Sequence, residues 1–287
     1  MPYLGAHMSI AGGLHKAIDR IRKVGGTALQ IFSKNQRQWK SPPLTEELVK
    51  KFFNNRSKWG DYPIAIHTSY LINLASSNED LKKKSIDALA DELNRAEILK
   101  IPYVILHPGS CGELPLDICL ENVVKGIDKA ISLAKCKNTN VLVENTSGQG
   151  TSLGSKLEEL AYIITNSKYN EKIFVCIDTA HLFQAGYDIR DSKGYKNTFQ
   201  SINKSIGIEK IKFFHLNDSK TELGSRVDRH EHIGKGHIGL QGFKLLLNDP
   251  RFKDHPMVLE TPKGKDLKED IENLKVLKSL MEDENKN

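Results

Sequence analysis

The sequence has few cysteines and no long apolar run. The four cysteines, Cys111, Cys119, Cys136 and Cys176, match neither a C-x-x-C pair nor a small disulfide framework, so we expect four reduced thiols. No apolar run approaches the ~18 residues that a membrane span needs. Charged side chains already occur within the first twenty residues, so we expect no signal peptide. These absences predict a protein that does not contact a membrane and stays in the cytoplasm, at the nucleoid or in a nucleus.

The chain also lacks a glycine-rich nucleotide-binding turn and an interdomain linker. A doubly wound open sheet would bind a nucleotide at a G-x-G-x-x-G turn, but the first turn here holds only the pair Gly12-Gly13. With 39% hydrophobic and 27% charged residues, the composition is that of a globular domain and excludes general disorder. The net charge of +6 permits a polyanionic partner such as nucleic acid without requiring one.

What the sequence does contain is a regular alternation of strand-type and helix-type segments. Amphipathic stretches of helical period occur at 81–99, 120–134, 157–165 and 267–281. Short apolar runs occur at 3–6, 28–32, 63–66, 103–106, 140–143, 174–177, 211–214 and 257–259. Eight β/α units in 287 residues give about 36 residues per unit, which suits a TIM barrel. We therefore predict an α/β protein with one (β/α)8 barrel domain over residues 1–287.

Metal-competent side chains follow six consecutive apolar runs, at the point where each run ends. In a parallel barrel these ends meet at one face, where active sites are built. Burying several unpaired imidazoles and carboxylates there would be costly, and metal coordination is the usual compensation. The six residues are His67, His107, Glu144, Asp178, His215 and Glu260.

Two further segments add candidate ligands from loops. His181 lies three residues after Asp178, and Asp228 and His230 belong to the segment 217–239, which is too long for an idle connection. The spacing H-x-H also leaves open a pairing of His230 with His232. We therefore expect a site with several metal ions at the barrel mouth.

The motifs at these positions resemble those of endonuclease IV, the family 2 apurinic/apyrimidinic endonucleases. They read GAHMSIAGGL, HTSYLINL, LHPGS, VENTSGQG, CIDTAHLFQAGYDI, HLNDSKTELGSRVDRHEHIGKGHIG and VLETP, and they span nearly the whole chain. The resemblance implies a TIM-barrel hydrolase for base excision repair with three zinc ions, Mn²⁺ being an alternative in part of the site. It implies a monomer that cuts double-stranded DNA on the 5′ side of an abasic site, leaving 3′-OH and 5′-deoxyribose phosphate ends. Trimming of 3′-blocking groups is a second implied activity.

The resemblance also assigns roles to individual residues. It implies that His67, His107 and Glu144 bind one zinc ion, with Glu144 bridging to a second ion. Asp178, His215 and Glu260 would complete the second ion, and His181, Asp228 and His230 would hold the third. Glu260 is expected to orient or deprotonate the nucleophile, with Glu144 beside it at the reacting position. His7 is expected to support the site or contact DNA rather than bind metal.

The DNA contacts implied by the resemblance lie in loops at the same mouth. Tyr70 and Leu71 resemble residues that wedge into the duplex from the minor groove, although they could equally be loop core. The residues expected to contact DNA are Asn35, Gln36, Arg37, Tyr70, Leu71 and Arg229. Two other classes remain as alternatives: a divalent-metal sugar isomerase or epimerase of the xylose-isomerase-like barrel type, and a non-catalytic metal- or DNA-binding protein.

Overall fold

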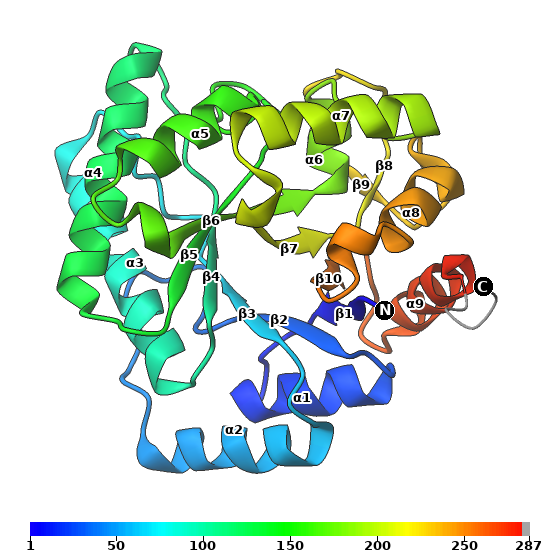
Figure 1. Ribbon diagram of the computed structural model, residues 1–287. Helices are drawn as coiled ribbons and strands as arrows, with labels where there is room; N and C mark the ends of the chain where they lie inside the picture. The colour runs from blue at the N-terminus through cyan, green and yellow to red at the C-terminus, as the bar shows by residue number, and fades with distance from the viewer. Residues whose placement is uncertain (283–287) are drawn as a thin grey trace.

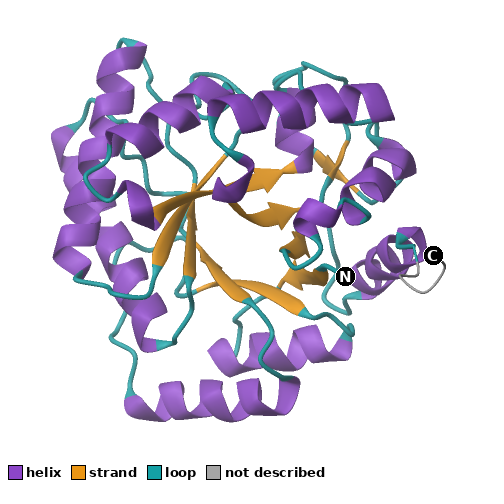
Figure 2. Cartoon of the chain, viewed as in Figure 1, coloured by secondary structure: helices purple, strands orange, loops and turns teal. Residues whose placement is uncertain are grey.

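A computed structural model describes residues 1–282, and within them eight parallel strands close into a barrel in the order β1-β10-β7-β6-β5-β4-β3-β2. This confirms the predicted TIM barrel, in which helices surround the strands (Figures 1 and 2). The predicted domain ends at residue 287, and residues 283–287 lie outside the described residues. The barrel strands are β1 (Tyr3–His7), β2 (Ala28–Phe32), β3 (Ile64–His67), β4 (Tyr103–Leu106), β5 (Asn140–Glu144), β6 (Ile173–Asp178), β7 (Ile211–His215) and β10 (Pro256–Leu259).

The four predicted helices all form, with small shifts at their ends. The largest shift is in α4, which begins at Leu116 rather than residue 120 because Pro115, which suits a helix start, precedes it directly. No helix in residues 1–282 is both long and apolar enough to cross a membrane. The helices are α1 (Leu14–Lys23), α2 (Glu46–Trp59), α3 (Glu79–Ile98), α4 (Leu116–Ala134), α5 (Leu157–Asn166), α6 (Thr179–Gln184), α7 (Ser192–Ser205), α8 (Gly239–Leu247) and α9 (Lys268–Leu280).

The barrel interior is a packed layer of small and large apolar side chains. Successive strand residues point to opposite faces, so one set packs against the helices and the other fills the barrel. Gly5 adds no side chain at β1, where a Cβ would lie 1.7 Å from the Ala28 carbonyl oxygen. The interior layer consists of Ala28, Ala65, Ile105, Leu142, Cys176, Phe213 and Val258. Because this layer closes the barrel below, polar side chains two residues further along can face only its mouth.

The structure corrects the expectation of four reduced thiols. Cys111, in the loop after β4, and Cys119, in the first turn of α4, form a disulfide with their Cα atoms 5.6 Å apart. The loop turns back on the helix start, which brings together two cysteines only eight residues apart in sequence. In the described part of the chain, Cys136 and Cys176 are free and buried, as expected.

The long segment 217–239 has more regular structure than the sequence predicts. Its β8 (Asp218–Ser219) pairs with β9 (His230–Glu231) as an antiparallel two-stranded ladder. These strands are too short to show a strand pattern in the sequence. This pairing positions His230 near the barrel mouth.

Candidate metal centre

Each barrel strand in residues 1–282 presents one polar side chain at the mouth, two positions beyond the interior layer. On β3, β5, β6 and β7 this residue ends the strand, whereas on β4 and β10 it follows directly. On β2 the residue is Gln30, inside the strand. The ring consists of His7, Gln30, His67, His107, Glu144, Asp178, His215 and Glu260. The period-two geometry therefore gathers all six predicted strand-end candidates in one place.

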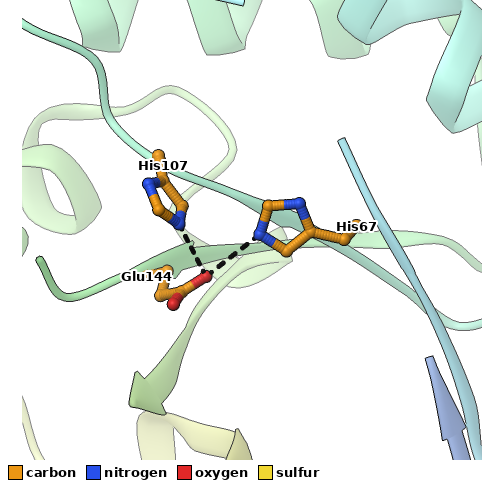
Figure 3. Close-up of side chains that lie close together, drawn as sticks. All are labelled: His67, His107 and Glu144. Atoms are coloured by element: carbon orange, nitrogen blue, oxygen red, sulfur yellow. Dashed lines mark hydrogen bonds and ion pairs between the residues drawn. The ribbon is translucent and has the colours of Figure 1, made fainter. Parts of the chain in front are cut away.

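The first group in this ring joins two imidazoles to one carboxylate oxygen. Nε2 of His67 and Nε2 of His107 each lie 3.2 Å from Oε2 of Glu144, as Figure 3 shows. The His67 ring is held by its other nitrogen, which donates to the Thr68 carbonyl oxygen at 2.7 Å. This fixes Nε2 as the nitrogen that faces Glu144. One cation could take a ligand atom from all three side chains, which lie within 4.8 Å of one another.

The second group shares Glu144 with the first and lies deepest in the mouth. Nδ1 of His215 is 3.0 Å from Oε1 of Glu144, 3.3 Å from Glu260 and 3.7 Å from Asp178. Glu144, Asp178 and His215 are fully buried. The side chain of Asn217 contacts both Asp178 and Glu260. It donates to Oδ2 of Asp178 at 2.6 Å and accepts from the Glu260 backbone N–H at 2.8 Å.

The third group joins the end of β6 to the loop that contains β9. Asp178 caps α6 by accepting from the His181 backbone N–H, which places His181 one turn along the same helix. Nε2 of His181 lies 3.2 Å from Oδ2 of Asp228, and Nε2 of His230 lies 3.3 Å from Oδ1. The set of potential ligand atoms that lie close together contains Asp178, His181 and His230. Asp178 therefore adjoins both the second and the third group.

These contacts favour a metal ion in the third group. In the described part of the chain, Nε2 of His230 is buried and has no hydrogen-bond partner, although two carboxylates lie nearby. A buried nitrogen with a free lone pair is costly unless something binds it. Nδ1 of His181 donates to the Asn145 carbonyl oxygen at 3.0 Å, which leaves its Nε2 directed at Asp228. Such a hydrogen bond on the other ring nitrogen is the usual support of a metal-binding histidine.

Opposite charges in the cluster shift its pKa values strongly. Burial alone would raise the pKa of Glu144 and of Glu260, but the facing His215 holds both pKa values well below the usual value. Burial alone would lower the pKa of His181, but Asp178 and the other carboxylates raise it well above normal. The cluster thus keeps its carboxylates charged and attracts positive charge, which is the environment that a cation requires.

One further side chain in this cluster, Cys176, was not among the sequence candidates. It lies close to Glu144 and His215, in a position where its sulfur could bind a metal. Burial raises the pKa of the Cys176 thiol to about 12, and the side chain belongs to the apolar layer that fills the barrel, two residues before Asp178. The side chains that face the mouth itself offer nitrogen and oxygen donors.

Four of the six residues expected to contact DNA line hollows that border the cluster. A cavity of about 730 Å³ is lined by Asn35, Gln36 and Tyr70 together with Glu260. Tyr70 is 63% exposed and lies at the edge of the barrel mouth. Arg229 lines a second, smaller hollow that also reaches His107, His181 and Asp228. Neither hollow is lined by Arg37, which is exposed, or by Leu71, which is half-buried.

The alternative pairing of His230 with His232 is not what the structure shows. Nδ1 of His232 lies 3.1 Å from the Asn273 amide nitrogen, on the side of α9. His7, by contrast, lies where the sequence places it, 3.3 Å from Oε1 of Glu260.

Sequence reasoning missed Gln30 and Asn217, which hold members of the cluster in place. Gln30 was overlooked because it lies within an apolar run rather than at its end. The signal that finds it is the period of two, since it follows the interior residue Ala28 by two positions. Asn217 follows His215 by two positions, and nothing in a single sequence separates it from an ordinary loop asparagine.

Comparisons with known proteins identify the family of this chain. A family model described as a xylose isomerase-like TIM barrel matches residues 18–280. The "Probable endonuclease 4" of Chloroflexus aurantiacus is 47% identical over 282 residues, covering 98% of this chain and 99% of that protein. A protein of the same name from Chloroflexus aggregans is 48% identical, with 98% of each chain covered.

Solved structures show the same relationship. Endonuclease IV from Thermus thermophilus matches with a TM-score of 0.87 and 39% identity, covering 97% of this chain and 98% of that one. A D-tagatose 3-epimerase-like protein matches with a TM-score of 0.73, covering 96% of each chain. At 18% identity the second likeness shows a shared fold alone.

Proposed function

Because the chain belongs to the endonuclease IV family, we propose that it is a zinc-dependent DNA-repair endonuclease that hydrolyses the phosphodiester on the 5′ side of an abasic site. The ends left would be a 3′-OH and a 5′-deoxyribose phosphate, and removal of 3′-blocking groups would be a second activity in base excision repair. The observation that carries the proposal is the set of three overlapping His and carboxylate groups at one barrel mouth.

The donor set fits three zinc ions. Imidazole nitrogens and carboxylate oxygens suit Zn²⁺, whereas sites of carboxylate and water suit Mg²⁺ or Mn²⁺, so Mn²⁺ is an alternative only in part of the site. His67, His107 and Glu144 would hold one ion, and Glu144, Asp178, His215 and Glu260 a second. His181, Asp228 and His230 would hold the third, with Asp178 adjoining it. When bound, zinc would supply Lewis-acid stabilisation of phosphate oxygens and a more acidic water.

Two carboxylates of the chain would act at the reacting atoms. Glu260 borders the large cavity and is charged, so it can orient a water molecule and accept its proton. Glu144 lies between four imidazoles and would hold these side chains in position beside the scissile phosphate. The leaving 3′ oxygen would depart opposite the attacking water, and no covalent bond to the protein is needed.

The surface around the mouth would bind double-stranded DNA as a monomer. Asn35, Gln36 and Arg37 would contact the backbone and the gap left by the missing base. Tyr70 and Leu71 would insert into the base stack. Arg229, which lies between the candidate ligands Asp228 and His230 in the sequence, would contact a phosphate. Extruding a nucleotide costs a few kcal/mol less where the base is already missing, so this step would favour abasic DNA.

The experiment is incision of a labelled duplex that contains one abasic analogue, with metal analysis of the same sample. We expect one product cut 5′ to the lesion, loss of activity with a chelator, recovery with Zn²⁺, and nearly three ions per chain. An intact duplex and a panel of aldoses and ketoses serve as matched substrates. Turnover of sugars without incision would replace the proposal by the isomerase or epimerase alternative, and binding to DNA without any turnover would replace it by a non-catalytic role.

A further inference from the structure

Gln30 occupies the one position of the mouth ring whose side chain cannot be charged. It lies on β2, is fully buried, and points into the barrel mouth between β1 and β3. Its amide makes three short contacts. Nε2 lies 2.5 Å from Oε1 of Glu260 and 2.8 Å from Nδ1 of His7, and Oε1 lies 2.7 Å from Nε2 of His215.

The oxygen of this amide accepts a hydrogen bond and its nitrogen donates. Oε1 has no hydrogen, so Nε2 of His215 must carry one and donate it. The lone pair of His215 is then kept on Nδ1, the nitrogen that faces Glu144, Asp178 and Glu260. At its other end the Gln30 amide donates to Glu260, which gives that buried carboxylate a partner besides the metal site.

The choice of an amide has an electrostatic reason. The mouth already contains the carboxylates of Glu144, Asp178 and Glu260, and a further charged acceptor beside them would add repulsion. An apolar side chain would leave the His215 Nε2–H buried without a partner and would remove one of the two partners of Glu260 Oε1, the other being His7. Glutamine offers an acceptor and a donor in one neutral group, which matches the two neighbours.

We propose that Gln30 is a positioning residue of the metal centre, holding Nδ1 of His215 toward the cation and Oε2 of Glu260 toward the same place. The inference rests on the proposed function, since it presumes that a metal ion binds there. Gln30 itself contacts neither the metal nor the reacting atoms. It acts through a histidine ligand and a carboxylate that belong to different strands, β7 and the end of β10.

The test compares two substitutions with a control on the same strand. Gln30→Met keeps the volume and removes all three hydrogen bonds, whereas Gln30→Glu keeps an acceptor for His215 but loses the donor to Glu260 and His7. Ile31→Val is the control because Ile31 is buried on the helix-facing side of β2 and makes no contact with the ring at the mouth. All three are prepared as the full zinc-loaded chain, alongside the parent.

The first measurement is nitrogen NMR of the histidine rings, which shows which nitrogen of His215 bears the hydrogen. We expect a hydrogen-bonded Nε2–H of His215 in the parent, in Gln30→Glu and in Ile31→Val, and the signal of an Nε2–H without that hydrogen bond in Gln30→Met. The second measurement is zinc release to a chromogenic chelator. Loss of such a supporting hydrogen bond weakens metal binding by about 10-fold to 100-fold, so Gln30→Met should release one ion at least ~10-fold faster.

The third measurement separates the two ends of the amide. Gln30→Glu should retain zinc but incise abasic DNA with a kcat about 10-fold lower and an unchanged KM, because His215 keeps its acceptor whereas Glu260 loses its donor and faces a further carboxylate. An unchanged His215 Nε2–H signal and a parental release rate in Gln30→Met would overturn the proposal, as would parental kcat in Gln30→Glu. If Gln30→Met does not fold, the kcat of Gln30→Glu decides alone. A parent that neither binds zinc nor cuts DNA would instead refute the proposed function.

Discussion

The candidate metal ligands come from two kinds of backbone, and the two are ordered in different ways. Glu144, Asp178 and His215 end strands that are hydrogen-bonded on both sides, and all three are fully buried. Asp228 and His230 come from the loop between β7 and α8, with side chains 42% and 16% exposed. The strand-borne half is positioned by the barrel itself, whereas the loop-borne half depends on the contacts that hold one loop.

Those loop contacts converge on Asp218, which lies in β8. Its carboxylate accepts the backbone N–H groups of Gly234, Gly236 and Ile238 at 2.9 to 3.1 Å. A Cβ on Gly236 would lie 2.3 Å from the Ser219 carbonyl oxygen, so the loop packs tightly around this carboxylate. β8 in turn pairs with β9 and so positions His230.

The metal site therefore combines ligands on rigid strand ends with ligands on a loop that can open more easily. Opening the loop breaks a two-stranded ladder and a few hydrogen bonds, whereas displacing a strand end requires breaking the barrel. We therefore expect chemistry to depend most on strand-end groups, and recognition of DNA and binding of the third ion to depend on the loops.

The largest effect should come from the strand-end carboxylate Glu260. Glu260→Gln removes the charge but keeps the size, and we expect the rate of abasic-site incision to fall at least ~10²-fold, the low end of general-base contributions. Single-turnover incision with parallel metal analysis measures this. Glu159→Gln is the control, since Glu159 is also buried but accepts from the Gly154 backbone N–H outside the cluster. Near-normal turnover with zinc retained would remove Glu260 from the proposed role.

The next effect concerns the loops that border the mouth. Replacing Arg37, Tyr70 and Leu71 together by alanine should weaken binding to abasic DNA by at least ~10-fold while binding to intact duplex changes little, because extrusion is what the three would favour. Fluorescence anisotropy with both duplexes measures the ratio, and the zinc content should not change.

A matched control for this variant replaces the same residue types on the helices, at Arg22, Leu133 and Tyr162, all exposed. Unchanged discrimination in the triple variant would assign specificity to the hollow around the metals alone.

A smaller effect should separate the two halves of the metal site. Asp218→Asn replaces an acceptor that faces only N–H groups by an amide that presents its own hydrogens, so the loop should loosen. We expect the third ion to be lost on dialysis while the other two remain, as measured by metal analysis. Asp249→Asn is the control, a buried aspartate bonded to Tyr195 and far from the loop. Loss of all three ions together, or of none, would contradict the division into two halves.

The sequence alone could predict the strand-borne half well, and the reason is geometric. Eight repeating units define where the strands end, and the parallel barrel brings those ends together without any further information. The loop residues were candidates from their spacing and from the length of the segment 217–239, but their assignment to a third ion came only from the resemblance of motifs, since nothing local directs Asp228 toward His181. Gln30 was missed because two of its partners, Glu260 and His215, come from the ends of β10 and β7, which approach β2 only when the pairing of β1 with β10 closes the barrel. The Cys111–Cys119 disulfide was not predicted because it depends on how the loop after β4 folds back onto the start of α4.

The smallest effect is a difference in pH dependence between the metal-free and the zinc-loaded protein. In the metal-free state burial alone would lower the pKa of His215, but the Glu144 and Glu260 carboxylates raise it well above the usual 6.5. His181 is shifted in the same direction. A histidine whose folded pKa is raised stabilises the fold fully below its unfolded pKa, and this contribution is lost as pH rises through the folded value.

The metal-free protein should therefore lose thermal stability over the interval that begins near pH 6.5 and ends at the raised pKa values of these histidines. Zinc must displace the same protons, so its binding strengthens with pH and the loaded protein should not decline over this interval. The melting temperatures of the two forms should diverge as pH rises, as measured by calorimetry with and without a chelator. His237→Asn, which removes a 42% exposed imidazole outside the cluster, should leave the divergence unchanged. Parallel pH profiles for the two forms would mean that His181 and His215 do not exchange protons for zinc.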